Sequence, residues 1–188
     1  TAEQTVTPLT DLTGRVASFV AIQEDISERL RTEGELIHLT ESDGLTGLPN
    51  RHMFLDRLQA SIERANRANA MVAVMVMDLD NFKSVNNTLG HEIGDKLLIT
   101  VAQRVAAVLR STDTLARLGG DDFAILLENV TDMAAASRTV RGILDAFHEA
   151  LQIDGHTLEA TASIGIAASP KDGEDPSTLL RHAEVAMY

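Results

Sequence analysis

Hydrophobic and polar positions follow one another along the chain with periods that predict a series of helices and strands. Between residues 51 and 69, Phe54, Leu58 and Ile62 recur at helical spacing, which is typical of an amphipathic helix. The next stretch, MVAVMVMDLD (residues 71–80), stays apolar until it ends on acidic residues. A continuous apolar run of this length predicts a strand buried on both faces.

The second half of the chain adds further helical patterns and a hairpin. Helical patterns cover residues 93–110, 133–151 and 176–188, and the segments TLARL and FAILLENV predict a hairpin around GGDD. Residues 151–169 predict a short strand, an Asp-Gly turn and a longer strand. This order predicts an α+β fold, a ferredoxin-like sandwich whose central, mostly antiparallel sheet is flanked by helices, most simply on one face. The hairpin is expected beside the first strand of the sheet.

The N-terminal segment has a different pattern. Alternating residues 15–22 predict a strand, and Asp25 with Glu28 resembles a capping box that opens a helix over about residues 26–40. The apolar stripe of that helix is narrow, so it needs a partner, and a short dimeric coil is one option. The loop DGLTGLPNR, with two glycines and a proline, marks the expected domain boundary.

Composition limits the classes of function. Hydrophobic residues are 44% and charged residues 23% of the chain, as in a soluble globular protein, and there is no cysteine. A metal must therefore bind through oxygen or histidine. No apolar run approaches the roughly 18 residues that span a bilayer, and no signal peptide is evident. We expect a cytoplasmic fragment, whose parent protein can be membrane-associated, and the net charge of −12 argues against nucleic-acid binding.

Two pairs of carboxylates mark the candidate site. Asp78 and Asp80 leave the end of the apolar strand, and Asp121 with Asp122 lies at the tip of the predicted hairpin. If the strand pairs with the hairpin, these carboxylates converge, and their repulsion favours a bound Mg²⁺, Mn²⁺ or Ca²⁺. Two such ions would suit phosphoryl or nucleotidyl transfer. The alternative is a turn cap and a solvated hairpin tip, and spacing alone leaves both readings open.

The glycines before the acidic pair favour a ligand site. Gly119 and Gly120 allow a ligand to approach the backbone closely, as phosphates do in glycine-rich loops. RLGGDDF resembles the signature loop of the GGDEF family, the diguanylate cyclases. The motifs DGLTGLPNR, DLDNFKSVNNTLGHEIGD, RSTD and SIGIA agree in order and spacing, from about residue 39 to 188. The resemblance implies a nucleotide-cyclase palm that condenses two GTP into cyclic di-GMP with Mg²⁺ or Mn²⁺.

The resemblance also assigns roles to individual residues. By this resemblance, Asp78, Asp121 and the carbonyl of Leu79 would bind the metal. Asn86 and Asp95 match the positions that hydrogen-bond guanine. The catalytic set is Asp121, Asp122 and Lys83, with Lys83 as the cation near the phosphates. The substrate-binding set is Asn86, Asp95, Gly119, Gly120 and Phe82, although Phe82 is expected to pack mainly in the core. We assign no chemistry to His91.

A regulatory site is implied by RxxD ahead of the signature loop. Arg110 and Asp113 match the family's inhibitory site. There, the arginine binds a phosphate and a guanine of the product, and the aspartate binds the edge of the base. A lone RxxD means little, because arginine is common at helix C-termini. The chain departs from the family pattern at Asp122, usually Glu, and at Glu184, usually Asp. It also stops at Tyr188, ahead of a lysine that helps to hold the phosphates.

The predicted organisation has three parts. Residues 1–24 resemble the end of a PAS sensor domain, residues 25–41 form a signalling helix, and residues 42–188 form a GGDEF domain whose last helix is truncated. Each domain offers one GTP site, so activity requires a twofold homodimer. Two alternatives stay open. One is a weak or silent GTP-binding domain that regulates a phosphodiesterase domain downstream in the chain, and the other is a cyclic di-GMP receptor that uses the RxxD site.

Overall fold

The computed structural model describes residues 2–10, 16–25 and 41–188. By contacts the chain divides into two compact units, Thr1–Thr40 and Glu41–Tyr188, which we describe separately. In the first unit, β1 (Ala2–Thr10) pairs antiparallel with β2 (Val16–Asp25). The strand predicted at residues 15–22 is confirmed as β2, which reaches Asp25, whereas β1 was not predicted. The predicted helix at residues 26–40 lies outside the described residues, and the PAS-like origin of this unit stays a prediction.

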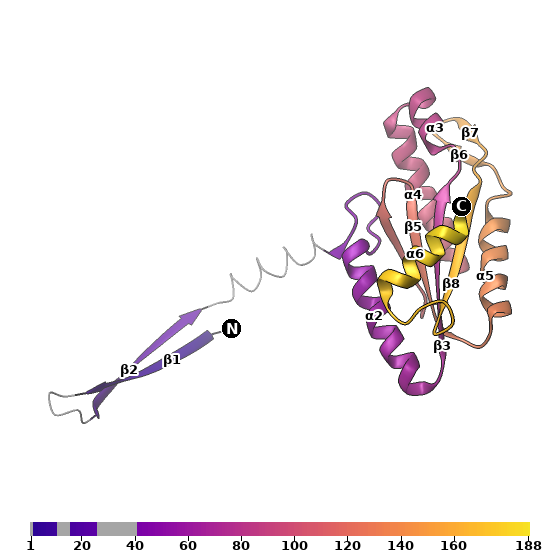
Figure 1. The fold of residues 1–188 in the computed structure, drawn as a ribbon. Helices are drawn as coiled ribbons and strands as arrows, with labels where there is room; N and C mark the ends of the chain where they lie inside the picture. The colour runs from indigo at the N-terminus through magenta and orange to yellow at the C-terminus, as the bar shows by residue number, and fades with distance from the viewer. Residues whose placement is uncertain (1, 11–15, 26–40) are drawn as a thin grey trace. The chain divides into compact units, whose positions relative to one another are not determined.

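Five helices and a four-stranded sheet build the described part of the second unit (Figure 1). Local capping fixes where three of the helices start: the side chains of Asn50, Asp132 and Asp175 each accept a hydrogen bond from a backbone amide three residues later. The helices are α2 (Arg51–Ala68), α3 (Phe82–Leu89), α4 (His91–Val108), α5 (Met133–Ala146) and α6 (Pro176–Met187).

The sheet has the strand order β4-β5-β3-β8, and every neighbouring pair is antiparallel. Its strands are β3 (Met71–Leu79), β4 (Thr114–Gly119), β5 (Asp122–Val130) and β8 (Ala162–Ser169). The predicted α+β class is thus confirmed, and the β4–β5 hairpin does lie beside β3. The pairing of Met77 with Phe123 brings the C-terminal end of β3 next to the hairpin tip.

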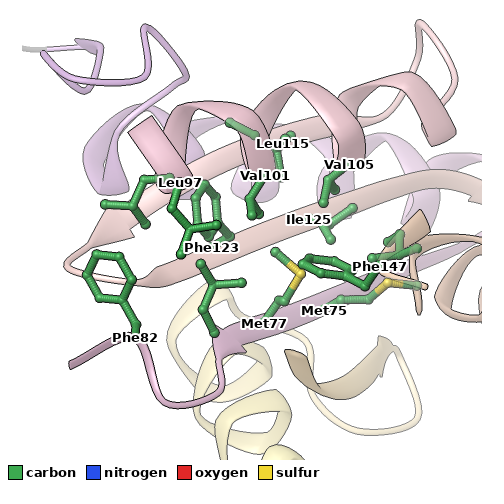
Figure 2. Packing of buried hydrophobic residues seen from close by; sticks show 14 of the residues in the cluster. Met75, Met77, Phe82, Leu97, Val101, Val105, Leu115, Phe123, Ile125 and Phe147 are labelled. Atoms are coloured by element: carbon green, nitrogen blue, oxygen red, sulfur yellow. The ribbon is translucent and has the colours of Figure 1, made fainter. Parts of the chain in front are cut away.

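The helices cover both faces of the sheet, so the expectation of helices on one face was wrong. Alternate residues of β3 belong to two different cores: Met75 and Met77 pack in one, and Val74 and Val76 in the other. The first core includes residues of α4 and α5, and the second includes residues of α2 and α6. Figure 2 shows the first core. A strand that is apolar on both faces needs a helical layer on each side, because either face left exposed would lose its hydrophobic stabilisation.

Two local predictions also need correction. The predicted longer strand within residues 151–169 is divided, since β7 (His156–Leu158) pairs only with β6 (Leu151–Ile153) in a small hairpin, and β8 joins the main sheet. The helix α3 was not predicted. Its sequence FKSVNNTL is short and polar, and Asn81, which precedes it, adopts the left-handed conformation with φ 60° and makes no side-chain cap hydrogen bond.

Candidate functional site

Where β3 ends beside the tip of the β4–β5 hairpin, the Asp78 carboxylate is hydrogen-bonded to that of Asp122, and Asp121 is close enough for its charge to act on both. Burial, followed by the negative charges of Asp121, Asp122 and Asp80 and by a hydrogen bond to Asp122, raises the pKa of Asp78 to about 6. Burial and the charge of Asp121 also raise the pKa of Asp122. Burial is the larger cause of both shifts, and repulsion between the neighbouring carboxylates adds to it, so a bound cation would be favourable here.

Asp80, by contrast, has a structural role at the end of β3. Its carboxylate accepts hydrogen bonds from Thr161 Oγ1 at 2.6 Å and Ser163 Oγ at 2.8 Å, and its backbone amide donates to the Thr161 carbonyl at 3.0 Å. These bonds join the end of β3 to the start of β8. Asp80 is therefore structural, as the turn-cap alternative expected, but it joins two strands rather than capping a local turn.

The donor set at this site suits a hard cation that also binds substrate. Within the described ranges, no group of three or more His, Asp or Glu side chains forms a ready metal cage. Mg²⁺ seldom requires such a cage, since it commonly uses one or two carboxylates and completes its coordination with substrate phosphates and water. Asp78, Asp121 and the Leu79 carbonyl supply oxygen ligands of that kind, so the residues fit a nucleotide-bound magnesium ion.

Asn86 holds an unsatisfied polar atom beside α4. Its Oδ1 is buried and has no hydrogen-bond partner in the described structure. A methyl group added at Gly94 would lie 1.9 Å from this oxygen, so Gly94 provides the space in which the Asn86 side chain sits. Asp95, the next residue, is exposed. A buried acceptor without a donor is costly, and a ligand that brings an N–H group would satisfy it.

The start of α3 offers backbone donors next to the carboxylates. The first amides of a helix have no acceptor four residues earlier within the helix. The Asn81 side chain does not cap α3, although the Asn81 carbonyl accepts from the Ser84 amide at 2.8 Å. Together with the helix dipole, such amides favour anions, including phosphates. Lys83 is exposed on the same turn. Phe82 is 9% exposed and belongs to the core, so its packing role agrees with expectation and its contact with substrate stays a prediction.

The tip of the hairpin is formed by two exposed glycines in unusual conformations. Gly119 has φ 140° and Gly120 has φ 56°, and nothing lies within 4 Å of a methyl group built on either residue. The backbone conformation, rather than lack of space, therefore requires glycine here. The open surroundings also leave the tip accessible to a ligand.

Two charged residues near the site, Glu184 and Arg51, were not predicted to lie there. The charge of Glu184, on α6, raises the pKa of Asp122, and the charge of Arg51, the first residue of α2, lowers it. Glu184 had been noted only as a departure from the family pattern. Arg51 belongs to the DGLTGLPNR motif, but nothing local in that motif indicates that it faces the signature loop.

The RxxD residues lie apart from the carboxylates, in the turn between α4 and β4. The Arg110 amide donates to Asp113 Oδ2 at 3.0 Å, and the Asp113 amide donates to the Arg110 carbonyl at 3.0 Å. Both residues line a cavity of about 100 Å³ that Arg138 of α5 also lines. Arg138 was not predicted, because an exposed arginine on a helix carries no sequence signal of its own. Asp113 and Glu128 line the same cavity, so an anionic ligand there would have to bind through the guanidinium groups of Arg110 and Arg138.

Comparison with known proteins identifies the fold and its family. The chain matches the family model described as "Diguanylate cyclase, GGDEF domain" over residues 40–188. It is 44% identical over 158 residues to the bifunctional diguanylate cyclase/cyclic di-GMP phosphodiesterase MucR of Pseudomonas aeruginosa, covering 84% of this chain and 23% of MucR.

Solved structures agree with that assignment. A fragment of P. aeruginosa TpbB (YfiN) that comprises only the GGDEF domain superposes with a TM-score of 0.77 at 40% identity, covering 78% of this chain and 86% of that one. The coiled coil and GGDEF domain of Caulobacter crescentus DgcB, in complex with c-di-GMP, gives a TM-score of 0.75 at 30% identity and covers 86% of both chains. No helix in the described part of the chain has the length and apolar character to cross a membrane. The predicted resemblance is confirmed, and the chain belongs to the GGDEF family of diguanylate cyclase domains.

Proposed function

We propose that this chain is a diguanylate cyclase, which condenses two GTP molecules into cyclic di-GMP and releases pyrophosphate. The observation that supports this most directly is the grouping of Asp78, Asp121 and Asp122 at the end of β3, where burial, followed by the charges of the neighbouring carboxylates, raises the pKa of Asp78 to about 6. Asp78, Asp121 and the Leu79 carbonyl would hold Mg²⁺ or Mn²⁺. A bound divalent cation neutralises the triphosphate and lowers the pKa of a coordinated hydroxyl.

The rest of the nucleotide has candidate partners on neighbouring elements. Asn86 Oδ1 is buried and has no donor, so it would accept from the guanine N–H groups. The exposed Asp95 would accept hydrogen bonds from the same edge of the base. The triphosphate would lie against the tip glycines, the first amides of α3 and Lys83. Guanine specificity therefore depends on α3 and α4, and phosphate binding on the hairpin tip and the start of α3.

The reaction requires two such sites. In each of two steps, the 3′-oxygen of one nucleotide forms a bond to the α-phosphorus of the other, the bond from that phosphorus to the bridging oxygen breaks, and pyrophosphate leaves. A twofold homodimer would place two nucleotides face to face with identical surfaces. The direct test incubates the chain with GTP and Mg²⁺ and measures cyclic di-GMP by mass spectrometry. A sample with a chelator is the control, and no product from a folded dimer would reject the cyclase proposal.

The alternative is a weak or silent GTP-binding domain that regulates a phosphodiesterase. It is favoured by Asp122, which is one methylene shorter than the family's usual Glu, whereas the relation to MucR, named as both cyclase and phosphodiesterase, supports only a phosphodiesterase partner. A shift of a carboxylate by roughly 1 Å can cost about 100-fold in rate. If the short side chain limits turnover, Asp122→Glu should raise kcat by about tenfold or more without a similar change in KM. An unchanged kcat, measured by product formation, would mean that Asp122 does not limit the reaction.

Product feedback is the proposed role of the cavity lined by Arg110, Asp113 and Arg138. Both guanidinium groups would bind the phosphates of cyclic di-GMP. We expect Arg110→Ala to raise the product concentration that half-inhibits the enzyme by about tenfold, and Arg138→Ala to act in the same direction. Lys171→Ala, which removes an exposed cation outside this cavity, is the control. Calorimetry with cyclic di-GMP provides a readout that does not require activity, and equal affinity in Arg110→Ala and wild type would reject the site.

A further inference from the structure

Arg117 connects the hairpin tip to the loop that begins the domain. This residue of β4 donates from Nε and Nη2 to the Gly120 carbonyl, at 2.9 and 2.7 Å. Its Nη1 lies 3.0 Å from both carboxylate oxygens of Asp43. One guanidinium therefore holds a backbone carbonyl of the tip and a carboxylate 74 residues earlier in the chain.

The other end of this connection is a rigid turn. Asp43 Oδ1 accepts from the Thr46 amide at 2.8 Å and from Thr46 Oγ1 at 2.6 Å, and the Asp43 amide donates to the Leu48 carbonyl at 2.8 Å. The Pro49 carbonyl accepts from the Arg117 amide at 3.0 Å. The turn at residues 43–49 is therefore closed by its own hydrogen bonds and attached to β4 twice.

The Asp43–Arg117 pair is shielded from solvent. The two side chains are only 20% and 12% exposed, so water screens their attraction less than it screens a typical surface ion pair. Burial alone would raise the pKa of Asp43, but hydrogen bonds from Thr46 and Arg117 and the guanidinium charge outweigh burial and hold that pKa below its usual value. The carboxylate is thus charged at neutral pH and bound to its partner.

The tip needs a restraint of this kind. Gly119 and Gly120 both have positive φ, and glycine has more conformational freedom to lose than any other residue. Because the peptide bond is planar and trans, two donors that fix the Gly120 carbonyl also fix the direction of the Asp121 amide on the other side of that bond. The position of Asp121 therefore depends on Arg117.

We propose that Asp43 and Arg117 are positioning residues: they clamp the Gly120–Asp121 peptide, so that the turn following residue 40 sets the geometry of the signature loop. This inference deepens the proposed function, on which its effect on turnover depends. The clamp itself does not require catalysis. It predicts that a change at Asp43, which lies in a different segment of the sequence, loosens the hairpin tip.

The experiment measures hydrogen exchange by mass spectrometry in peptides that cover the tip, without nucleotide. Arg117→Lys keeps the charge but replaces the three-nitrogen fork by a single nitrogen, so the four contacts of Arg117 cannot all be kept, and Asp43→Asn turns one acceptor into a donor that faces the guanidinium. Each variant should speed exchange at the tip by about tenfold. Arg64→Lys is the matched control, because Arg64 pairs with Glu128 across α2 and β5 without contact to the tip. It should leave exchange at the tip unchanged.

A second arm measures turnover where the wild type forms cyclic di-GMP. We expect kcat to fall at least about tenfold in Arg117→Lys and Asp43→Asn, with KM for GTP within about twofold, and no such fall in Arg64→Lys. Wild-type exchange at the tip in a folded Asp43→Asn would overturn the clamp, whether or not the enzyme is active. An inactive wild type whose tip still loosens in both variants would reject the cyclase and retain the clamp. If Arg64→Lys lost as much turnover, the loss in the other two variants would be due to general destabilisation, and the positioning role of Asp43 and Arg117 would be overturned.

Discussion

Replacing Asp78 by asparagine is expected to abolish cyclic di-GMP synthesis and, without metal, to make the protein more stable to heat. The activity should fall at least about 100-fold, because Asp78 is one of two carboxylates proposed to hold the cation. The stability should rise, because burial, followed by the charges of Asp121, Asp122 and Asp80, opposes ionisation of Asp78 and raises its pKa to about 6. A neutral amide of the same shape removes that repulsion at neutral pH.

The sign of the stability effect follows from the direction of the pKa shift. An acid whose pKa is raised on folding is ionised more readily in the unfolded chain, so at neutral pH its ionisation favours unfolding. The gain from Asp78→Asn should therefore be present at pH 7.5 and largely lost at pH 4, where the carboxyl is protonated in the fold and partly protonated in the unfolded chain, whose pKa is 3.8. Thermal melts in a chelator at both pH values provide the measurement.

The control for this variant is Asp56→Asn. Asp56 lies on the exposed surface of α2 near His52, and its charge is not among the named causes of the pKa shifts of Asp78 and Asp122. It should leave both the melting temperature and the turnover close to wild type. An Asp78→Asn protein that melts below the wild type in chelator, or that keeps a tenth of the activity, would contradict the convergent-carboxylate site.

The sequence indicates much of the sheet because its strongest signals are local. The run MVAVMVMDLD contains enough apolar residues to bury both faces of β3, and the glycine pair fixes where the β4–β5 hairpin turns. A strand whose side chains are apolar on both faces leaves neither face for solvent. The same run therefore also indicated a helical layer on each side of the sheet. The one-sided arrangement was inferred from the order of elements, which does not state the face that each helix covers.

The contacts that were missed are those between residues distant in the sequence. Asp43 belongs to a glycine-rich loop and Arg117 to a short strand, and neither has a local pattern that connects it to the other. Arg138 enters the RxxD cavity only because α5 packs beside β5 and the α4–β4 turn. Side chains on separate elements become neighbours through tertiary packing. The sequence determines this packing, but no local pattern in a single sequence reveals which distant residues come into contact.

The glycine of the SIGIA motif illustrates how packing explains a motif without chemistry. A methyl group at Gly165, in β8, would lie 2.0 Å from the Ala183 carbonyl oxygen and 2.4 Å from the Met187 amide nitrogen. Both atoms belong to the backbone of α6, so no side-chain rotation can relieve the overlap. The helix can rest directly on the strand only because this residue has no side chain.

Gly165→Ala is therefore expected to displace α6 and to destabilise the domain by about 2–3 kcal/mol, the upper part of the range for overpacked cores. For a domain of this size, the melting temperature should fall by roughly 5–10 °C, as measured by circular dichroism. Gly44→Ala is the matched control, since nothing lies within 4 Å of its added methyl group and Gly44 has no positive φ. Its effect should stay within about 0.5 kcal/mol.

The displacement should also reach the candidate site, because α6 carries Glu184, whose charge acts on Asp122. Gly165→Ala should lower turnover at temperatures well below its melting transition, where the protein is still folded. A Gly165→Ala protein with wild-type stability would mean that α6 and β8 adjust at little cost. In that case the close approach would not account for glycine at this position, and the packing explanation of the motif would be wrong.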